Sequence, residues 1–458
     1  MKLYKKNKKP DMHKFINFAA LSITLLLSIT PLIAQVQDST LTYDEAVSIA
    51  LRENIQIRQQ ENILETARAE RAQAYANMAP SLNFGATGQR IYGRQFDNTT
   101  GRFTEQKVDR LYGGLSAELT LFNGFAIVNT IKQRQKAAEA QFYQINQSKQ
   151  DVIFSVSQQY LQVLLNQELL RIAKSNLKQQ NELAASIKIF VETGTRNIAD
   201  QYNQESEARK AALSVVEMEN QLTVSKVQLI RTLQIDPFEN WIFTEPDFNE
   251  EIVLEERSSM EDMYNTAIAN RYDLKQQTNN IDASKYALRA TKSLYYPNLS
   301  LGYDLYSQYS NLDEENNLEK QLFDINNSQV ISLRLNVPIF NNLSTRTRIQ
   351  RSKQELNNAM LDLEDLERNI FEQLQTAIAD YNTAQERIVA AEAQVKAAEK
   401  ALEAEKERFR LGVGNILDLN RVNAAYVEAL STQAQANYQL IFQKTALDYY
   451  QGTLDNSL

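Results

Sequence analysis

Two stretches of 69 residues each, Phe125–Thr193 and Leu343–Leu411, contain neither glycine nor proline. The whole chain of 458 residues holds only 12 glycines and 7 prolines, and Ala, Gln, Glu, Leu and Lys fill the intervals, as in long helices and coiled coils. A helix of this length would extend roughly 100 Å at about 1.5 Å per residue. No globular core needs such a helix, so the two stretches predict an elongated and mainly helical molecule.

Apolar residues recur at heptad spacing within both stretches. In the second they are Ile388, Ala391, Val395, Ala398, Leu402 and Phe409, with Glu405 at the one missing step; in the first they are Ile153, Val156, Tyr160 and Val163. Such seams bury helices against neighbouring helices along their length. Because many seam residues are alanines flanked by Gln and Lys, the stripe favours a thin wall with one wet side over a dense core.

The chain is an internal duplication. The segment that begins at Ala50 aligns without a gap with the segment that begins at Ala267, and later blocks keep almost the same offset, which brings Gly194 opposite Gly412 and Asp200 opposite Asp418. Similarity that holds its offset through separated blocks indicates a repeat. Because its period is about half the chain, we expect two tandem copies of one unit.

Each half is expected to contain a helix that ends before a proline (Asp44–Met78 and Met260–Tyr295), a strand hairpin, a long helix, a tip and a last helix. We expect a signal peptide over 1–34 and a linker over 236–258. The first repeat is expected over 35–235, with strands near 82–92 and 111–122, a long helix over about 125–193 and a tip at about 194–200. The second repeat is expected over 259–458, with strands near 298–309 and 329–340, a long helix over about 343–411 and a tip at about 412–418. Trp241, the only tryptophan, is expected to anchor the linker.

The first 34 residues have the order of a secretory signal peptide. A lysine-rich start is followed by an apolar stretch over 15–33 and by Ala34 before a polar switch, which favours cleavage after Ala34 over a retained membrane anchor. The net charge of the whole chain is -8, and removal of this basic segment makes it more acidic. An acidic excess argues against a nucleic-acid partner.

The sequence predicts no catalytic residue, metal site or cofactor. The chain has no cysteine, and its single histidine, His13, lies in the segment expected to be cleaved. The mature chain therefore lacks the thiolate and imidazole groups of Ser-His-Asp and Cys-His nucleophile systems and of the usual zinc sites. A glycosidase with two carboxylates stays possible on composition, but no fold signal supports it. We do not expect an enzyme.

Four segments alternate between apolar and polar residues and predict strands. In VISLRLNVPIF the residues Ile331, Leu333 and Leu335 share one face, whereas Ser332 and Arg334 share the other. Each segment alone fits a half-buried strand of a soluble sheet. Together, in an exported chain, their length, alternation and polar loops indicate a membrane β-barrel. Four strands cannot close a barrel, which needs about eight, so several chains must pool their strands.

Both long stretches end on similar sequences, GTRNIAD at 194–200 and GVGNILD at 412–418. Glycine allows the left-handed conformation that ends a helix. Asn197 and Asn415 then stand at the N-cap of the next helix, with Asp200 and Asp418 three residues on, in an arrangement that resembles a capping box. The turn and the cap explain these residues without any further function, although in an oligomer each aspartate would also form a ring of carboxylates.

The doubled order of strand hairpin, very long helical hairpin and glycine tip resembles the TolC-like outer-membrane efflux channels, also called outer membrane factors. The resemblance covers essentially the whole mature chain, and its specificity lies in the order, doubling and spacing of the motifs. It implies a homotrimer with a twelve-stranded barrel in the outer membrane of a Gram-negative bacterium, in contact with outer-membrane lipid, continued by a twelve-helix α-barrel across the periplasm. It also implies a periplasmic adaptor (membrane fusion) protein and an inner-membrane pump as partners.

The resemblance implies roles for residues at the tips. The adaptor-docking positions would be Gly194, Thr195, Gly412 and Val413, and the candidate tunnel-entrance or capping residues are Arg196, Asn197, Asp200, Asn415 and Asp418. The chain departs from the family pattern, because the arginine expected in the second repeat is Gly414 here, an expected acid is Arg421, and an expected tyrosine is Phe409. We therefore expect the entrance to be closed by a different set of contacts.

The sequence thus predicts an exit duct of a tripartite efflux or type I secretion system, which passively conducts cargo delivered by a pump. The alternative is an exported coiled-coil scaffold of the cell envelope, since heptads alone also fit such a protein. The sequence does not indicate whether the cargo is a drug, a metal ion or a protein.

Overall fold

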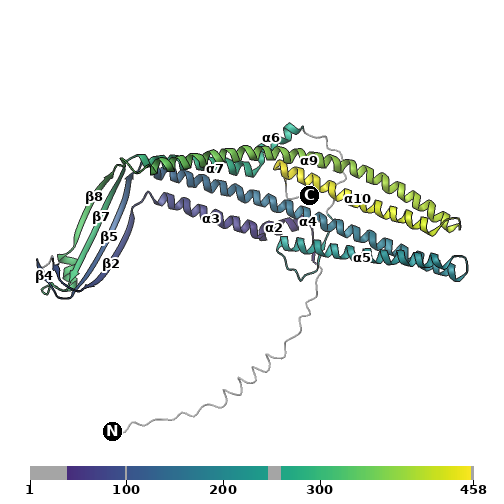
Figure 1. Cartoon of the computed structure of the whole chain (residues 1–458), viewed down its shortest axis with the longest axis horizontal. Coiled ribbons are helices and arrows are strands. Elements are labelled where there is room, and N and C mark those ends of the chain that lie inside the picture. The colour runs from purple at the N-terminus through teal and green to yellow at the C-terminus, as the bar shows by residue number, and fades with distance from the viewer. Residues whose placement is uncertain (1–38, 98–100, 246–258, 455–458) are drawn as a thin grey trace, which may run out of the picture.

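The computed structural model describes residues 39–97, 101–245 and 259–454. The predicted signal peptide, 1–34, and part of the predicted linker, 246–258, lie outside the described residues. The molecule is elongated, with a sheet at one end and long helices that run away from it (Figure 1). Within the described residues, no helix is long and apolar enough to cross a membrane.

The main sheet has four antiparallel strands in the order β2-β5-β7-β8. The strands are β2 (Ser81–Ile91), β5 (Val108–Phe122), β7 (Asn298–Ser310) and β8 (Ser328–Asn336). The repeats therefore supply one hairpin each, and β5 joins β7 across the repeat boundary. The strand expected over 329–340 ends earlier, at Asn336, because Pro338 has no N–H for the ladder.

The two faces of this sheet differ in polarity. The register places Phe84 beside Leu115 and Leu115 beside Leu305, so apolar side chains line up across the strands on one face. One residue along, Asn83 lies beside Ser116, and Ser116 beside Asp304, on the other face. The alternation seen in the sequence thus separates one apolar face from one polar face.

Additional short elements lie between the strands of each hairpin. The first loop carries the small hairpin β3 (Gln95–Asp97) and β4 (Arg102–Thr104), and the second carries the short helices α8 (Leu318–Lys320) and η3 (Gln321–Ile325). A turn of 3-10 helix, η2 (Ser293–Tyr295), precedes β7. The sequence predicted only polar loops at the two hairpin connections, so these short elements were not expected.

The two glycine-free stretches form α4 (Ala126–Glu192) and α9 (Ser344–Arg410), of 67 residues each. Each is followed by a helix of 36 residues, α5 (Ile198–Leu233) or α10 (Ile416–Gln451), which packs back against it (Figure 1). Most of the predicted seam residues face the interior. Those that are buried are Ile153, Val156, Tyr160, Val163, Ala391, Leu402, Glu405 and Phe409, whereas Ile388, Val395 and Ala398 are half-buried. The residues before both long helices have positive φ, at Phe125 and Leu343.

The helices that precede the strand hairpins are each broken once. The structure has α2 (Tyr43–Glu53) and α3 (Ile55–Ala76) where one helix over Asp44–Met78 was expected, and α6 (Met260–Asn270) and α7 (Tyr272–Lys292) where one over Met260–Tyr295 was expected. The single-helix prediction is wrong because Asn54 and Arg271 leave the helical conformation, with ψ of 127° and 132°. The Asn54 side chain then caps α3 by accepting from the N–H of Gln56.

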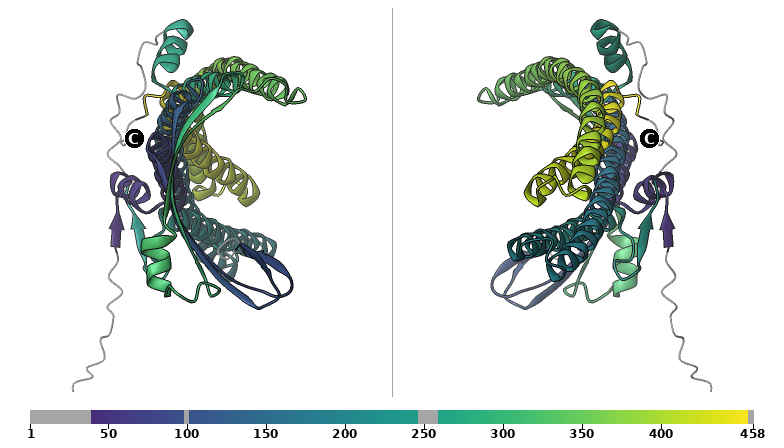
Figure 2. Two further views of the ribbon diagram at one scale, coloured as in Figure 1. Left: turned by 90° about the vertical axis from the view of Figure 1, so that its left-hand side faces the viewer. Right: turned by 90° about the vertical axis from the view of Figure 1, so that its right-hand side faces the viewer.

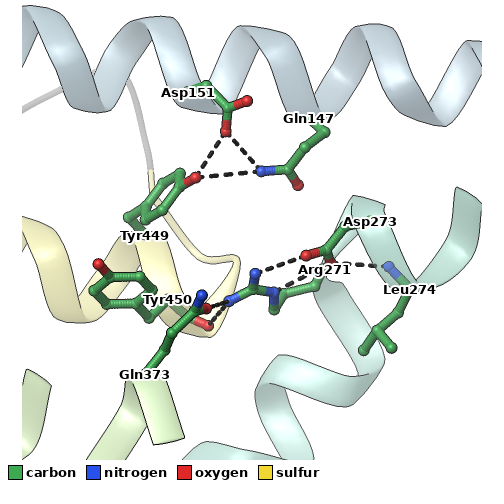
Figure 3. Close-up of polar contacts among 8 residues, drawn as sticks. All are labelled: Gln147, Asp151, Arg271, Asp273, Leu274, Gln373, Tyr449 and Tyr450. Carbon is green, nitrogen blue, oxygen red and sulfur yellow. Dashed lines mark hydrogen bonds and ion pairs between the residues drawn. The ribbon is translucent and has the colours of Figure 1, made fainter. Parts of the chain in front are cut away.

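The two break residues make equivalent contacts, each within its own repeat. Asn54 Nδ2 donates to the carbonyl oxygen of Thr232, in the last turn of α5, at 3.4 Å. Arg271 Nη1 donates to the carbonyl oxygen of Tyr450, in the last turn of α10, at 3.2 Å (Figure 3). Each break thus ties its segment to the returning end of the helical hairpin of the same repeat.

A compact core surrounds the middle of α4. The parallel pair β1 (Ser39–Leu41) and β6 (Trp241–Phe243) packs on it, and the buried Tyr160 hydroxyl lies 2.9 Å from the carbonyl oxygen of Leu41 and 2.7 Å from that of Thr244. Trp241 packs against this core and donates its indole N–H to the Asp236 carbonyl oxygen, which fits the expected anchor. In end view the helices form an arc, with α2 and α6 on its outer side (Figure 2).

Candidate functional site: the tips of the helical hairpins

The turn between α4 and α5 is a tight helix C-cap. Gly194 has φ of +74°, and the N–H groups of Thr195 and Arg196 both donate to the carbonyl oxygen of Phe190, at 2.8 and 3.2 Å. This is the left-handed ending that glycine makes possible. The turn closes on its own backbone and leaves the side chain of Thr195 exposed.

The turn between α9 and α10 repeats this geometry. Gly412 has φ of +76°, and the N–H groups of Val413 and Gly414 both donate to the carbonyl oxygen of Arg408, at 3.1 and 3.0 Å. A Cβ at Gly414 would lie 2.7 Å from the backbone nitrogen of Phe409. An arginine therefore does not fit at position 414 in this conformation, which explains one departure from the family pattern.

Both predicted N-caps are present. Asn197 Oδ1 accepts from the N–H of Ala199 at 3.1 Å, and Asn415 Oδ1 accepts from the N–H of Leu417 at 3.2 Å. The reciprocal half of a capping box is missing at both tips among the described residues, although Thr42 and Glu45 form a complete one in α2. The aspartate side chain is one methylene shorter than glutamate, so Asp200 and Asp418 serve here as first-turn acids at the positive end of a helix dipole.

The two aspartates differ in their surroundings. Asp418 is exposed and lies 3.7 Å from Arg421, the residue that stands where the family pattern has an acid. Asp200 is half-buried and forms no ion pair within the described residues. The carboxylate of the second repeat therefore has a cationic partner, whereas that of the first repeat has none among the described residues.

Arg196 links the two tips. Its Nη2 atom donates to the carbonyl oxygen of Gly414 at 3.4 Å, and its guanidinium carbon lies 4.5 Å from the centre of the Phe409 ring. Phe409 cannot donate a hydrogen bond, but the face of its ring attracts a cation. The structure therefore brings together two of the three departures from the family pattern, an arginine in the first repeat and a phenylalanine in place of tyrosine.

Below the tips, a small apolar core joins α4 to the second hairpin. It contains Ile187, Leu402, Phe409, Ile416 and Leu419. Glu405 lies on the same seam with its side chain 9% exposed, and Arg408 Nη1 binds its Oε2 atom at 3.0 Å. The other oxygen, Oε1, has no hydrogen-bond partner among the residues that the structure describes. The seam break seen in the sequence is thus a buried carboxylate.

A chain of amide side chains lies next to this core and was missed in the sequence. Gln204, fully buried, donates to the side-chain oxygen of Gln180 at 2.5 Å and accepts from Asn420 at 3.0 Å, and Asn423 donates to Asn176 at 2.9 Å. These bonds connect both hairpins. The only sequence signal was the presence of amides at helix positions that are otherwise apolar.

Around the turns, apolar side chains stand in solvent. They are Ile189, Phe190, Ile198, Leu411, Val413 and Leu417, which are 42% to 70% exposed. Nearby, the Arg410 guanidinium binds Glu407 at 2.6 Å and lowers the pKa of that carboxyl. The tips therefore expose apolar side chains close together at one end of the molecule.

The comparisons with known proteins agree with this architecture. The family model of the outer membrane efflux protein matches residues 46–233 and 263–453. The protease secretion protein PrtF of Dickeya chrysanthemi is 22% identical, over 90% of this chain and 88% of that protein. The outer membrane efflux protein BepC of Brucella suis is 21% identical, over 84% of each chain. The solved outer membrane channel CmeC of Campylobacter jejuni shares the fold, with a TM-score of 0.79 and 16% identity over 91% of this chain and 87% of that one.

Proposed function

Because this chain belongs to the outer membrane efflux protein family, we propose that three copies of it form a passive exit duct across the outer membrane of a Gram-negative bacterium. The duct would be a twelve-stranded barrel continued by a twelve-helix tunnel in the periplasm. Cargo would enter at the hairpin tips and leave at the β3–β4 end of the sheet.

The observation that carries this proposal is the combination of two unlike faces and two free edges in one sheet. Within the described residues, the outer edges of β2 and β8 have no partner strand. Open edges are not tolerated in hydrocarbon, and four strands are too few to close on themselves. Three chains, with β8 of each beside β2 of the next, would remove every edge and turn the apolar face toward lipid.

The tips support a partner at the opposite end. Their exposed apolar side chains, with Thr195 and Val413 at the two turns, offer a docking surface for a periplasmic adaptor protein. The adaptor would connect the duct to an inner-membrane pump, which supplies the energy. PrtF is named for protease secretion and BepC for efflux, so the cargo class would follow from the pump rather than from this chain.

The exported coiled-coil scaffold is less well supported. An exported coiled-coil scaffold does not require a sheet with one apolar face, and it does not require a sheet whose two edge strands lack partners. The duct requires both features.

The direct functional test is conductance. Purified protein added to a planar lipid bilayer should give discrete current steps that persist at constant size in each opening. Bilayers that stay silent with protein shown to be inserted would contradict the duct.

A further inference from the structure

A hollow lies on the apolar face of the sheet, beneath a short segment that crosses it. We call this segment, 318–327, the roof; it contains α8 and η3 and lies on the outer side of the arc (Figure 2). The cavity has a volume of about 390 Å³. Its walls include Phe84, Leu111, Leu115 and Leu305 from the strands and Leu322 and Phe323 from the roof.

The hollow exists because the strands beneath the roof carry small residues. Gly113 and Ala86 are directly paired across β5 and β2, and both line the cavity. A Cβ added at Gly113 would meet no atom within 4 Å. A larger side chain would fit at Gly113, so the hollow is left open by the small residues there and not by the path of the backbone.

The roof is fastened by polar bonds at its margins. Ser307 Oγ donates to the carbonyl oxygen of Leu322 at 2.6 Å, and Asn326 Nδ2 donates to that of Gln308 at 3.0 Å. The fully buried Gln321 accepts from the N–H of Ser310 and donates to its carbonyl oxygen, at 2.9 and 3.1 Å. The roof thus stays over the sheet without filling the space under it.

Among the described residues, the cavity lining contains no charged side chain, but the roof and the loop before it are acidic. Between residues 311 and 327 there are five acidic side chains and one basic side chain, Lys320. Glu319 and Asp324 are the nearest acids in sequence to Leu322 and Phe323, the two apolar roof residues that line the cavity. An anionic head group would be repelled here, whereas an ammonium group would be attracted.

From this geometry we propose that each chain holds one acyl chain of a zwitterionic phospholipid in the hollow, with the lipid ammonium group beside the roof carboxylates. Pockets of a few hundred Å³ with apolar walls and a few polar groups at the margin are typical ligand sites. The site rests on the proposed function, because it requires this face of the sheet to lie against the membrane. Its surface is continuous with the apolar face that the duct presents to lipid.

The test is lipid retention measured by native mass spectrometry. Wild-type protein in detergent is equilibrated with dioleoyl phosphatidylethanolamine, or separately with dioleoyl phosphatidylglycerol, and then washed with detergent. Gly113→Leu fills the hollow, and Ala86→Leu does so from the paired strand. Gly85→Leu is the matched control, because a Cβ there also meets no atom within 4 Å but points to the polar face.

We expect wild type and Gly85→Leu to retain phosphatidylethanolamine, and Gly113→Leu and Ala86→Leu to lose it. Phosphatidylglycerol should be retained less than phosphatidylethanolamine in wild type. Equal retention in all four proteins, or equal retention of both lipids or of detergent alone, would overturn the site. Conductance of the wild-type sample is recorded separately, so a conducting protein without retained lipid refutes the lipid site and leaves the duct intact.

Discussion

The guanidinium of Arg196 lies 4.5 Å from the centre of the Phe409 ring, and the two residues come from opposite repeats. The same arginine donates to the carbonyl oxygen of Gly414, which is its own counterpart in the second repeat. One side chain therefore joins the turn of the first hairpin to the end of the second.

Arg196→Ala should let the two tips separate. A cation over an aromatic ring at a partly exposed site contributes about 0.5–1 kcal/mol, so the population with separated tips should rise a few-fold. Nitroxide labels at Thr193 and Leu411, the C-caps of α4 and α9, would report the distance by pulsed electron paramagnetic resonance. The control, Arg209→Ala, removes an exposed arginine from α5; the same distance distribution in both variants would show that Arg196 does not hold the tips.

Arg271→Ala should destabilise the second repeat. Arg271 is 7% exposed and binds Asp273 at 2.6 Å, Gln373 at 3.1 Å and the Tyr450 carbonyl oxygen at 3.2 Å (Figure 3). Removal of one partner from a buried ion pair costs about 3–5 kcal/mol. Arg68→Ala, which breaks an exposed pair with Glu65, should cost less than about 1 kcal/mol. The midpoints of thermal unfolding of the two variants would be compared. Equal midpoints would contradict a stabilising role for the contacts of Arg271 at the end of α10.

Alkaline conditions should weaken the core around α4. Burial raises the pKa of Tyr43 to about 12 from its usual 10.0, despite the opposing hydrogen bond with Ser157. The unfolded chain releases this proton first, so the stabilisation is complete below pH 10 and is lost as the pH rises toward 12. Each pKa unit corresponds to about 1.4 kcal/mol.

The measurement is the unfolding midpoint between pH 8 and pH 12. Tyr43→Phe should make the midpoint fall less steeply above pH 10, whereas Tyr202→Phe, at a tyrosine that is 63% exposed, should leave the slope as in wild type. If the midpoint falls equally steeply with pH in Tyr43→Phe and in wild type, the Tyr43 hydroxyl does not contribute to the alkaline loss of stability.

Val413→Asp should prevent capture of the adaptor. Val413 is 70% exposed at the second turn, and a new carboxylate there places a charge in an apolar contact. Gly194 and Gly412 are poorer positions for such a test, because their positive φ makes any side chain strained. Co-purification with the adaptor should be lost in Val413→Asp and kept in Leu213→Asp, an exposed apolar site midway along α5. If both variants still capture the adaptor, the tips are not part of the docking surface.

Much of the fold follows from local patterns in the sequence. Alternation over residues 329–336 fixes the faces of β8, and the absence of glycine and proline from 125 to 193 permits α4 to run unbroken. Gly194 and Gly412 mark the two turns because only a positive φ ends a helix in this way. These features depend on residues close together in the chain.

The rest depends on contacts between distant segments. Nothing near Arg271 breaks a helix, and its break is stabilised by Tyr450, 179 residues away. The roof forms because Gln321 binds the backbone of Ser310. The pairing of Arg196 with Phe409 arises from the way the two hairpins pack, so neither residue alone predicts it. The docking and entrance roles of the tip residues stay predictions.

The central claim is that neighbouring chains share one sheet, and disulfide cross-linking of its edges tests this most directly. The chain has no cysteine, so Ser332→Cys in β8 can be combined with Asn83→Cys or Thr87→Cys in β2, all of which lie on the polar face. Side chains paired across strands lie about 5 Å apart. Oxidised outer membranes should yield two-chain and three-chain products with a double variant and only two-chain or single-chain material with Ser332→Cys alone. Single chains from every double variant, in protein that is present in the outer membrane, would contradict the shared sheet.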